Sequence, residues 1–234
     1  MQKFNQSKSS TPTYPDEAST SIGETRVQFE LNQDEGKLLI SLARKAVEGY
    51  LKNKKQISIP QGTPNKLMQP CGVFVTINSI ERGEKELRGC IGYPYPTDPL
   101  AQAVVQSAIS AATEDPRFYP LSLEELDRVV FEVSVLTPPQ PVEAKKPTEY
   151  PTKIKVGEDG LIIERDMYKG LLLPQVPVEW KWNEEEFLCQ CCIKAGLPPD
   201  NWLLNNTKVY KFQAIIFEEE TPKGEVKRKA LGGN

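Results

Sequence analysis

The segment Leu87–Gly92 reads Leu-Arg-Gly-Cys-Ile-Gly and holds the residue types best suited to chemistry in this chain. Two glycines flank a thiol, and a guanidinium lies just upstream. Glycine weakens a strand and marks a bulge or a close approach of backbone or ligand. We therefore predict that Gly89 and Gly92 expose the segment to a ligand. The fork of Arg88 suits a carboxylate or a phosphate, with an internal ion pair as the alternative.

The thiol of Cys90 is the first candidate for catalysis. Beside Arg88, its pKa can be lowered, which favours a role as nucleophile or redox sensor. However, the chain contains no histidine and therefore lacks the usual general base near neutral pH. Cysteine is also a small apolar residue that fills tight spaces. Structural packing is thus the favoured interpretation of Cys90, and reactivity is the alternative.

Two carboxylates, Glu132 and Asp115, are the candidates for proton transfer. Glu132 interrupts the strand predicted at 129–136, where a carboxylate must be paired or hydrated. We expect it to pair with an arginine such as Arg88 or to line a cleft. Asp115 and Arg117 flank a proline just after a predicted helix. There they serve either a binding site, with Arg117 orienting an anionic group, or the stability of the turn.

Two further clusters come from the second half of the chain. Trp180 and Trp182 alternate with charged residues, a pattern that suits stacking on bases or lining an interface, and Trp180 is a candidate binding residue. A wall between two halves of the fold is the favoured interpretation. Cys189, Cys191 and Cys192 fall on one predicted helix and do not supply four tetrahedral ligands for zinc. We expect core packing there and no metal site.

Composition limits the function classes. The chain has 234 residues and a net charge of −3, and its charges are interspersed rather than gathered on a basic segment, which argues against nucleic-acid binding. The absence of histidine excludes Ser-His-Asp and Cys-His catalysis within the chain. Five cysteines without framework spacing argue against a secreted disulfide scaffold. No stretch has the length of a membrane span and the start lacks a signal-peptide core, so we predict a cytoplasmic protein.

The pattern of elements positions these residues. Capping boxes predict helices that begin at Asn32 and Asn183, and Asp98 with Pro99 predicts another helix start. Ser122 with Glu125 indicates a short helix. The strands are expected at 72–78, 86–91, 129–136, 154–156, 161–165, 170–173 and about 208–217, with a turn at Asp159-Gly160.

Each half thus reads strand, strand, helix, short helix, strand. This predicts an α+β fold with two β-β-α-α-β-like repeats, at about 30–140 and 150–218, that share a largely antiparallel, barrel-like sheet with flanking helices. The domain spans 27–220. Residues 1–26 form an N-terminal extension rich in Ser, Thr and Pro, with low intrinsic order. Residues 221–234 form a charged tail.

The Leu-Arg-Gly-Cys-Ile-Gly run, with its neighbours, resembles the hallmark of the AMMECR family, in its archaeal and bacterial form. The likeness covers roughly residues 30–220 and also includes 72–78, 114–120, 132–137, 172–176 with Trp180, and 192–197. It implies an α+β fold of two repeats around a barrel-like sheet, and a cleft where the hallmark run meets the acidic and aromatic positions. In microbes, members of this family are associated with a radical-chemistry protein and with a Memo-like protein.

Two hypotheses for function follow. In the first, a small-molecule or anion-binding cleft at the hallmark run serves an enzyme or the partner of an enzyme. In the second, the hallmark surface and Trp180 dock a protein, so that the chain is an adaptor. The sequence leaves the ligand, any cofactor and the oligomeric state open.

Overall fold

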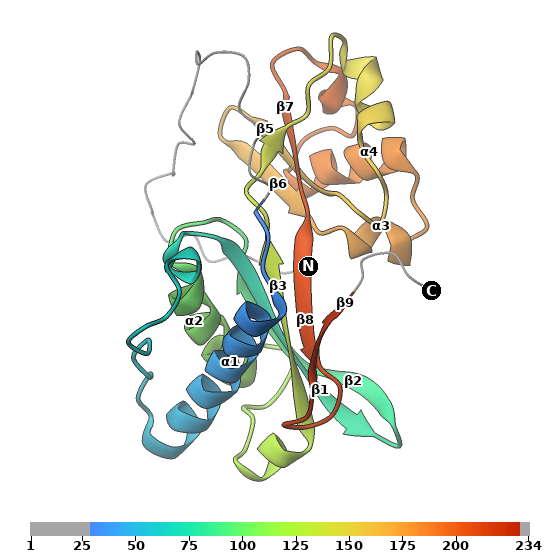
Figure 1. The fold of residues 1–234 in the computed structure, drawn as a ribbon. Coiled ribbons are helices and arrows are strands. Elements are labelled where there is room, and N and C mark those ends of the chain that lie inside the picture. Colours follow the sequence, from blue (N-terminus) through green and yellow to red (C-terminus); the bar gives the residue numbers. More distant parts are fainter. Residues whose placement is uncertain (1–28, 230–234) are drawn as a thin grey trace.

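The computed structural model describes residues 29–229, and the predicted N-terminal extension lies outside this range. The chain forms a lower and an upper half, each with its own sheet and helices (Figure 1). In chain order the elements are α1 (Gln33–Asn53), η1 (Asn65–Met68), β1 (Gly72–Glu81), β2 (Glu84–Tyr93), α2 (Leu100–Thr113), η2 (Glu124–Asp127), β3 (Val129–Leu136), β4 (Gln140–Pro141), η3 (Pro147–Lys153), β5 (Gly160–Arg165), β6 (Tyr168–Leu172), α3 (Gln175–Glu179), α4 (Glu184–Lys194), η4 (Asn201–Leu203), β7 (Lys208–Phe212), β8 (Ala214–Glu219) and β9 (Val226–Lys229).

The predicted capping boxes at α1 and α4 are confirmed. The side chain of Asn32 accepts a hydrogen bond from the backbone N–H of Glu35 (2.9 Å), and the Glu35 carboxylate accepts one from the Asn32 N–H (2.8 Å). Asn183 and Glu186 pair in the same way. The expected cap at Asp98 is wrong, because its carboxylate accepts a hydrogen bond from the Thr97 hydroxyl (3.1 Å) and α2 begins at Leu100.

The first sheet has the strand order β2-β1-β3-β8-β9 and is antiparallel throughout. Helices α1 and α2 cover one face. The strands alternate as predicted: Val73, Val75 and Ile77 of β1 are buried in the core with α1 and α2, as are the odd-numbered residues 129–135 of β3. Phe74 and Thr76 therefore point to the opposite face, which we call the outer face.

The second sheet has the order β4-β7-β5-β6, and α4 packs on β5 and β6. The strand expected at 154–156 is wrong. The carboxylate of Asp159 accepts a hydrogen bond from the Lys155 N–H (3.0 Å), which closes residues 155–159 into a turn. The hairpin lies one strand later, where β5 pairs with β6 around Asp166, whose φ is +54°.

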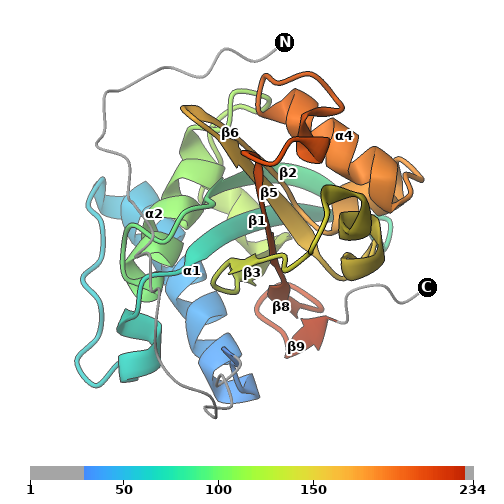
Figure 2. The ribbon, with the colours of Figure 1, turned by 90° about the horizontal axis from the view of Figure 1, so that it is seen from above.

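The two halves repeat one topology. The order β2-β1-β3 in the first sheet recurs as β6-β5-β7 in the second, and α2 and α4 follow the equivalent hairpins. The α+β class and the antiparallel pairing are confirmed. The strands, however, form two sheets rather than one shared, barrel-like sheet. Figure 2 shows α1 and α2 on one side of the strands and α4 on the other.

One long stretch joins the two sheets. The strand predicted at 208–217 breaks at Gln213, so that β7 belongs to the second sheet and β8 to the first. At the break, Gln213 and Thr137 exchange two hydrogen bonds of 2.8 Å, from the Gln213 N–H to the Thr137 hydroxyl and from the Thr137 N–H to the Gln213 carbonyl. The two segments that connect the halves, at Thr137 after β3 and at Gln213 after β7, therefore lie side by side.

Part of the segment assigned to a charged tail is structured. Residues Val226–Lys229 form β9, the edge strand beside β8, and Val226 is buried. The basic side chains that follow Val226 all make ion pairs, with Glu220, Glu30, Glu132 and Glu218 as partners.

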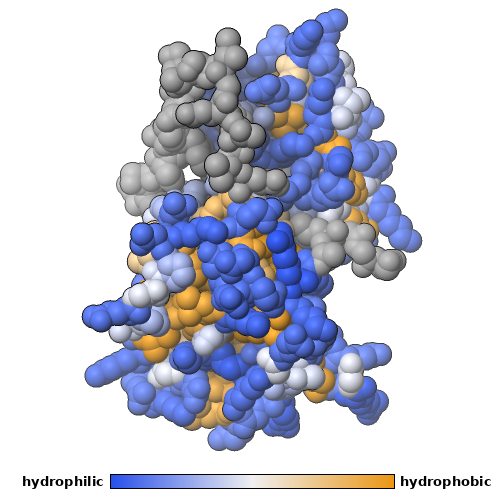
Figure 3. Space-filling view, viewed as in Figure 1, coloured by the Kyte–Doolittle hydropathy of each residue, from blue (hydrophilic) through white to orange (hydrophobic). Residues whose placement is uncertain are grey.

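Hydrophilic residues cover most of the face in Figure 3, and hydrophobic residues show between them in the lower half. Within residues 29–229, every helix is too short or too polar to cross a lipid bilayer.

Candidate functional site

Three polar side chains lie next to one another on the outer face of the first sheet. Cys90 of β2 is directly opposite Thr76 of β1, which is directly opposite Glu132 of β3. Cross-strand neighbours of this kind place their Cβ atoms about 4.5–5.5 Å apart. The Thr76 Oγ1 and the Cys90 Sγ are 3.3 Å apart. We call these three residues the polar row.

Glu132 is held by a residue that we did not anticipate. The Nζ of Lys229 in β9 lies 3.1 Å from the Glu132 Oε2, whereas Arg88 pairs elsewhere. The Glu132 side chain is 16% exposed and that of Lys229 is 49% exposed, so the carboxylate is mostly covered and the ammonium is open to solvent. The only signal for Lys229 in the sequence was its place in residues 221–234, which we predicted to form a charged tail.

Asp115 and Arg117 complete the edge of the polar row. The Asp115 Oδ2 accepts a hydrogen bond from the backbone N–H of Cys90 (2.8 Å), and the Arg117 Nη2 donates to the same oxygen (2.7 Å). The Arg117 Nη2 also lies 3.5 Å from the Cys90 carbonyl oxygen. Since β2 is an edge strand, these two side chains occupy backbone groups that would otherwise face solvent.

The Arg117 guanidinium holds the pKa of the Asp115 carboxyl at about 2, with help from the backbone N–H groups of Cys90 and Arg117. The Asp115 side chain is only 2% exposed. A carboxylate that stays ionised at every ordinary pH and already accepts several hydrogen bonds is suited to positioning its neighbours rather than to exchanging a proton.

Burial raises the pKa of the Cys90 thiol above its usual value. The Thr76 hydroxyl and the Arg117 charge oppose this shift, whereas Glu132 and Asp115 add to it. The thiol therefore lies within electrostatic reach of all four groups and stays protonated at neutral pH. A protonated thiol is a weak hydrogen-bond donor and a poor nucleophile.

Arg88 lies apart from the polar row. The register of β1 and β2 shifts between Ile77 and Asn78, so that Arg88 is the extra residue of a β-bulge. Its Nε donates to the Glu125 Oε1 (2.8 Å) and its Nη1 donates to the Tyr119 carbonyl oxygen (2.9 Å). Arg88 thus makes the internal ion pair and fastens the 117–125 loop to β2.

The glycines of the hallmark run are explained by packing. A Cβ on Gly89 would overlap the carbonyl oxygen of Ala111 in α2, and a Cβ on Gly92 would overlap the Val73 carbonyl oxygen and the Phe74 ring. The predicted close approach is therefore real at both positions. It is made by α2 and by Phe74 themselves.

The remaining candidates lie in the second half. Trp180 caps α3, is 68% exposed and stacks on Trp182, with ring centroids 6.1 Å apart. Cys191 and Cys192 are fully buried in the second core, and burial raises the pKa of Cys192 to about 11. Among residues 29–229, no three His, Cys, Asp or Glu side chains are grouped to hold a metal ion.

The second repeat carries an apolar version of the polar row. There, Leu171 of β6 is opposite Ile162 of β5, which is opposite Tyr210 of β7. Gly170 takes the place of Gly89, because a Cβ on it would lie 2.5 Å from the Ala195 nitrogen just after α4. The two repeats share a helix–glycine contact but place different chemistry beside it.

An apolar pocket of about 170 Å³ lies where the two halves meet. Its lining includes Cys71, Pro94, Leu136, Ile162, Leu171 and Phe212. The polar row does not line this pocket, so the two features are separate.

Comparison with known proteins identifies the relatives of this chain. The profile of the AMMECR1 family matches residues 40–217, a range that contains both repeats and the whole polar row. The chain belongs to the AMMECR1 family. Lys229, which pairs with Glu132, lies beyond the range that the AMMECR1 profile matches.

AMMECR1 relatives from archaea are similar over nearly their full length. Protein PH0010 of Pyrococcus horikoshii is 56% identical over 204 residues, which is 87% of this chain and 98% of that protein. A protein of Methanothermobacter thermautotrophicus is 53% identical over 81% of this chain and 97% of its own length. The crystal structure of the uncharacterized protein PH0010 superposes with a TM-score of 0.75, covering 86% of this chain and 99% of that one.

Proposed function

We propose that this protein binds a small polar molecule on the outer face of its first sheet, at the polar row formed by Cys90, Thr76 and Glu132. The observation that carries the proposal is the contrast between the repeats. At equivalent positions the second repeat has Leu171, Ile162 and Tyr210, which pack in the hydrophobic cluster between the halves. The first repeat has a thiol, a hydroxyl and a carboxylate there, although the second repeat forms the same arrangement of strands with hydrophobic residues at these positions.

Each group in the site has a distinct role. Arg117 is 47% exposed and faces the edge of the row, so it orients an anionic group of the ligand. Glu132 accepts hydrogen bonds or a proton from the bound molecule. Asp115 and Arg88 are positioning residues, because the first fixes the backbone of Cys90 and the second fastens the adjacent loop. Cys90 contacts the ligand as a protonated thiol.

The test is a thermal-shift screen with a panel of small carboxylic acids, phosphate esters, amines and amino acids. A ligand present at about ten times its Kd stabilises the protein by about 1.4 kcal/mol. For a chain of this size that is about 3–5 °C in Tm. We expect hits in the full chain whose shift is lost in Glu132→Gln and in Arg117→Gln.

Matched variants control for general effects of charge removal. Arg228→Gln removes an arginine of nearly equal exposure (48%) that also pairs with a carboxylate, and Glu158→Gln removes an exposed ion pair in the second half. Both should keep the full shift. Hits that persist in Glu132→Gln and Arg117→Gln would place binding elsewhere and contradict the proposal.

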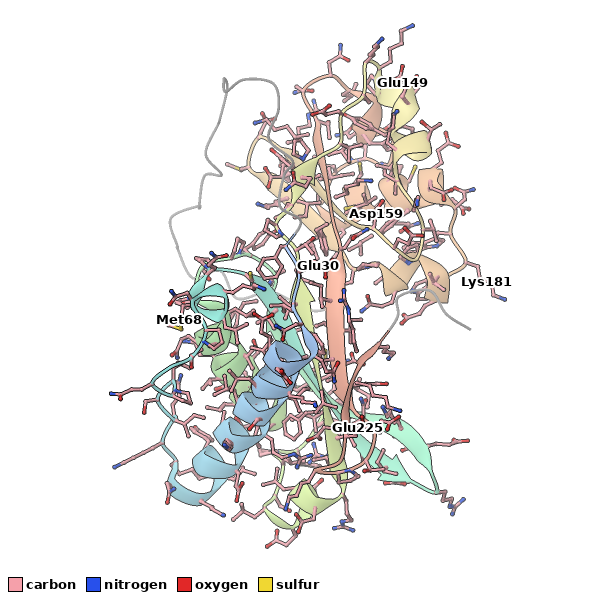
Figure 4. All side chains as sticks on the ribbon, viewed as in Figure 1. Glu30, Met68, Glu149, Asp159, Lys181 and Glu225 are labelled. Atoms are coloured by element: carbon pink, nitrogen blue, oxygen red, sulfur yellow. The ribbon has the colours of Figure 1, made fainter. Side chains whose placement is uncertain are left out.

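A second function, protein binding, is favoured by a specific observation. Trp180 and Val178 are 68% and 52% exposed, and they lie at the end of α3, outside the hydrophobic core of their own repeat. Figure 4 labels their neighbour Lys181 at the outer edge of the upper half. Exposed aromatic and aliphatic residues together are typical of sites that bind a partner.

Protein binding predicts a partner captured through this surface. Chemical cross-linking in extract should give a defined adduct with the full chain that is lost in Trp180→Ala and kept in Tyr119→Ala, which removes another highly exposed aromatic ring. Adducts that are insensitive to Trp180→Ala would exclude this role for the α3 surface.

A further inference from the structure

The apolar pocket between the halves has a lining that shares no residue with the polar row. At about 170 Å³ it is smaller than the 300–1,000 Å³ sites that hold drug-sized ligands. It is close to the roughly 150 Å³ of an engineered apolar cavity that binds benzene. The pocket therefore has room for a single ring.

Proline is unusually frequent around this pocket. Five prolines line it, together with the aromatic ring of Phe212: Pro70, Pro94, Pro96, Pro138 and Pro139. Grooves with aromatic side chains bind extended, proline-containing segments, which lose little conformational entropy on docking, and Phe212 supplies the aromatic ring of this lining.

The chain itself contains such a segment close by. The described residues start at Phe29, which packs against the first core, and Figure 4 labels its neighbour Glu30 at the junction of the two halves. Residues 1–28 precede it and include the run Pro12-Thr13-Tyr14-Pro15. The alignment with the Pyrococcus protein covers 98% of that protein but only 87% of this chain.

We propose that the pocket is the docking site of this chain's own N-terminal segment, with the ring of Tyr14 inserted and Pro12 and Pro15 against the proline-lined rim. The apolar lining takes the ring, and the Thr137 hydroxyl and the Cys71 thiol are the polar side-chain groups of the lining. The proposal is independent of the ligand site on the outer face.

The tether favours this contact. About 15 residues separate Tyr14 from Phe29, and an extended chain of that length spans up to about 50 Å, so reach does not limit docking. A short tether also gives an effective concentration in the millimolar range, so a contact too weak to hold a free peptide still holds a linked segment.

Photo-cross-linking in the full chain tests the proposal. The photoreactive amino acid p-azidophenylalanine, whose single ring matches that of tyrosine, replaces Tyr14 in one variant and Phe4, the other aromatic residue of the segment, in the control. Cross-links from position 14 should map to residues 70–72, 94–96 or 136–139. Filling the pocket with Pro96→Trp should lower their yield about fivefold or more, as expected for loss of a weak tethered contact. Leu171→Phe is the second pocket variant if Pro96→Trp alters thermal unfolding.

Cross-links from position 14 that are dispersed, or that match those from position 4, would overturn the proposal. A second measurement uses phenol, the single ring of a tyrosine side chain, as the probe. Tyr14→Ala should bind phenol about fivefold more tightly than the unsubstituted chain, because Tyr14 no longer competes. Equal saturable binding to both proteins would mean that the pocket is open to small molecules, and that Tyr14 does not occupy it.

Discussion

The two repeats of this protein have the same arrangement of strands and helix, but the equivalent rows of side chains are polar in the first repeat and hydrophobic in the second. In both, a glycine on the second strand lets a helix contact the sheet, Gly89 against α2 and Gly170 against α4. One residue further on, the first repeat has Cys90 in a row with Thr76 and Glu132, whereas the second has Leu171 in an apolar row. The comparison shows that the fold of a repeat requires the glycine at the helix contact but does not require polar residues in the row beside it.

This comparison changes how the hallmark run is understood. Gly89, Gly92 and Arg88 are each accounted for by contacts within the chain. What the fold does not require is the polar character of Cys90 and its neighbours, since the second repeat folds with leucine and isoleucine at those positions. The unexplained part of the motif is therefore its thiol, and that is where we assign function.

The largest expected effect comes from the shared glycines. Gly89→Ala and Gly170→Ala should each destabilise the fold by about 3 kcal/mol, because the added methyl group meets helix backbone that cannot move aside. Chemical denaturation measures this. Gly83→Ala is the control, since Gly83 has φ of +85° but no neighbour near a Cβ, and it should cost only about 1 kcal/mol. If only one of the two repeats is sensitive, the shared role fails.

Exchanging the central residues of the two rows should affect stability unequally. Ile162→Thr places a hydroxyl in the apolar contact between the halves, where Ile162 is 1% exposed, and should destabilise by about 2 kcal/mol. Thr76→Ile makes the reverse change on the outer face and should cost less than about 1 kcal/mol while removing any ligand-induced shift in Tm. Equal losses of stability in the two variants would refute the distinction between a packing row and a binding row.

Asp115→Asn should destabilise the protein by about 2 kcal/mol at pH 7, because the edge of β2 loses a charge-assisted hydrogen bond to the Cys90 N–H. The pKa of Asp115 is lowered from 3.8 to about 2 in the fold, so its stabilisation is present above the ordinary pKa and is lost as pH falls from about 4 towards 2. Unfolding curves of the two proteins should therefore converge in acid.

The matched control for this pH dependence is Asp127→Asn, which removes an exposed carboxylate paired with Lys223. Its pKa is also lowered, by Lys223, but the pair is exposed to solvent, so Asp127→Asn should change stability far less than Asp115→Asn at every pH. A constant difference between the original chain and Asp115→Asn down to pH 2 would mean that the carboxylate charge is not what stabilises the β2 edge.

The smallest effect concerns the reactivity of the thiol. Because burial raises the pKa of Cys90, its alkylation by iodoacetamide should still be accelerating above pH 9. Arg117→Gln should slow the reaction at pH 8 about twofold, since the Arg117 charge favours the thiolate. Peptide mass spectrometry follows Cys90 separately, with buried Cys71 as a slower reference. A rate that levels off near pH 7 would restore Cys90 as an activated nucleophile.

Local patterns gave correct predictions wherever the cause was local. Alternation identified the faces of β1 and β3 and therefore the side on which Glu132 lies. The capping boxes located the starts of α1 and α4 because donor and acceptor are three residues apart. The reading of strand, strand, helix, short helix, strand anticipated the repeated topology. Its strand at 154–156 was wrong, and its strand at 208–217 is divided at Gln213 into β7 and β8.

The sequence did not predict which residues pair with the site residues. Arg88 binds Glu125, 37 residues away, and Glu132 binds Lys229, 97 residues away. Arg88 and Cys90 are two positions apart, so in a regular strand they would lie on the same face of the sheet. The one-residue β-bulge at Arg88 breaks this alternation. Nothing in the spacing of these residues indicated the bulge.

The sequence by itself determined the periodic faces, the helix starts and the presence of two similar halves, because each depends on hydrogen bonds and burial within a few residues. Only the tertiary structure decided which groups meet: that β8 and β9 return to complete the first sheet, that Asp115 reaches Cys90, and that the second apolar row is used for packing. Sheet register and the docking of the halves fix these contacts, and both result from burial summed over segments far apart in the chain.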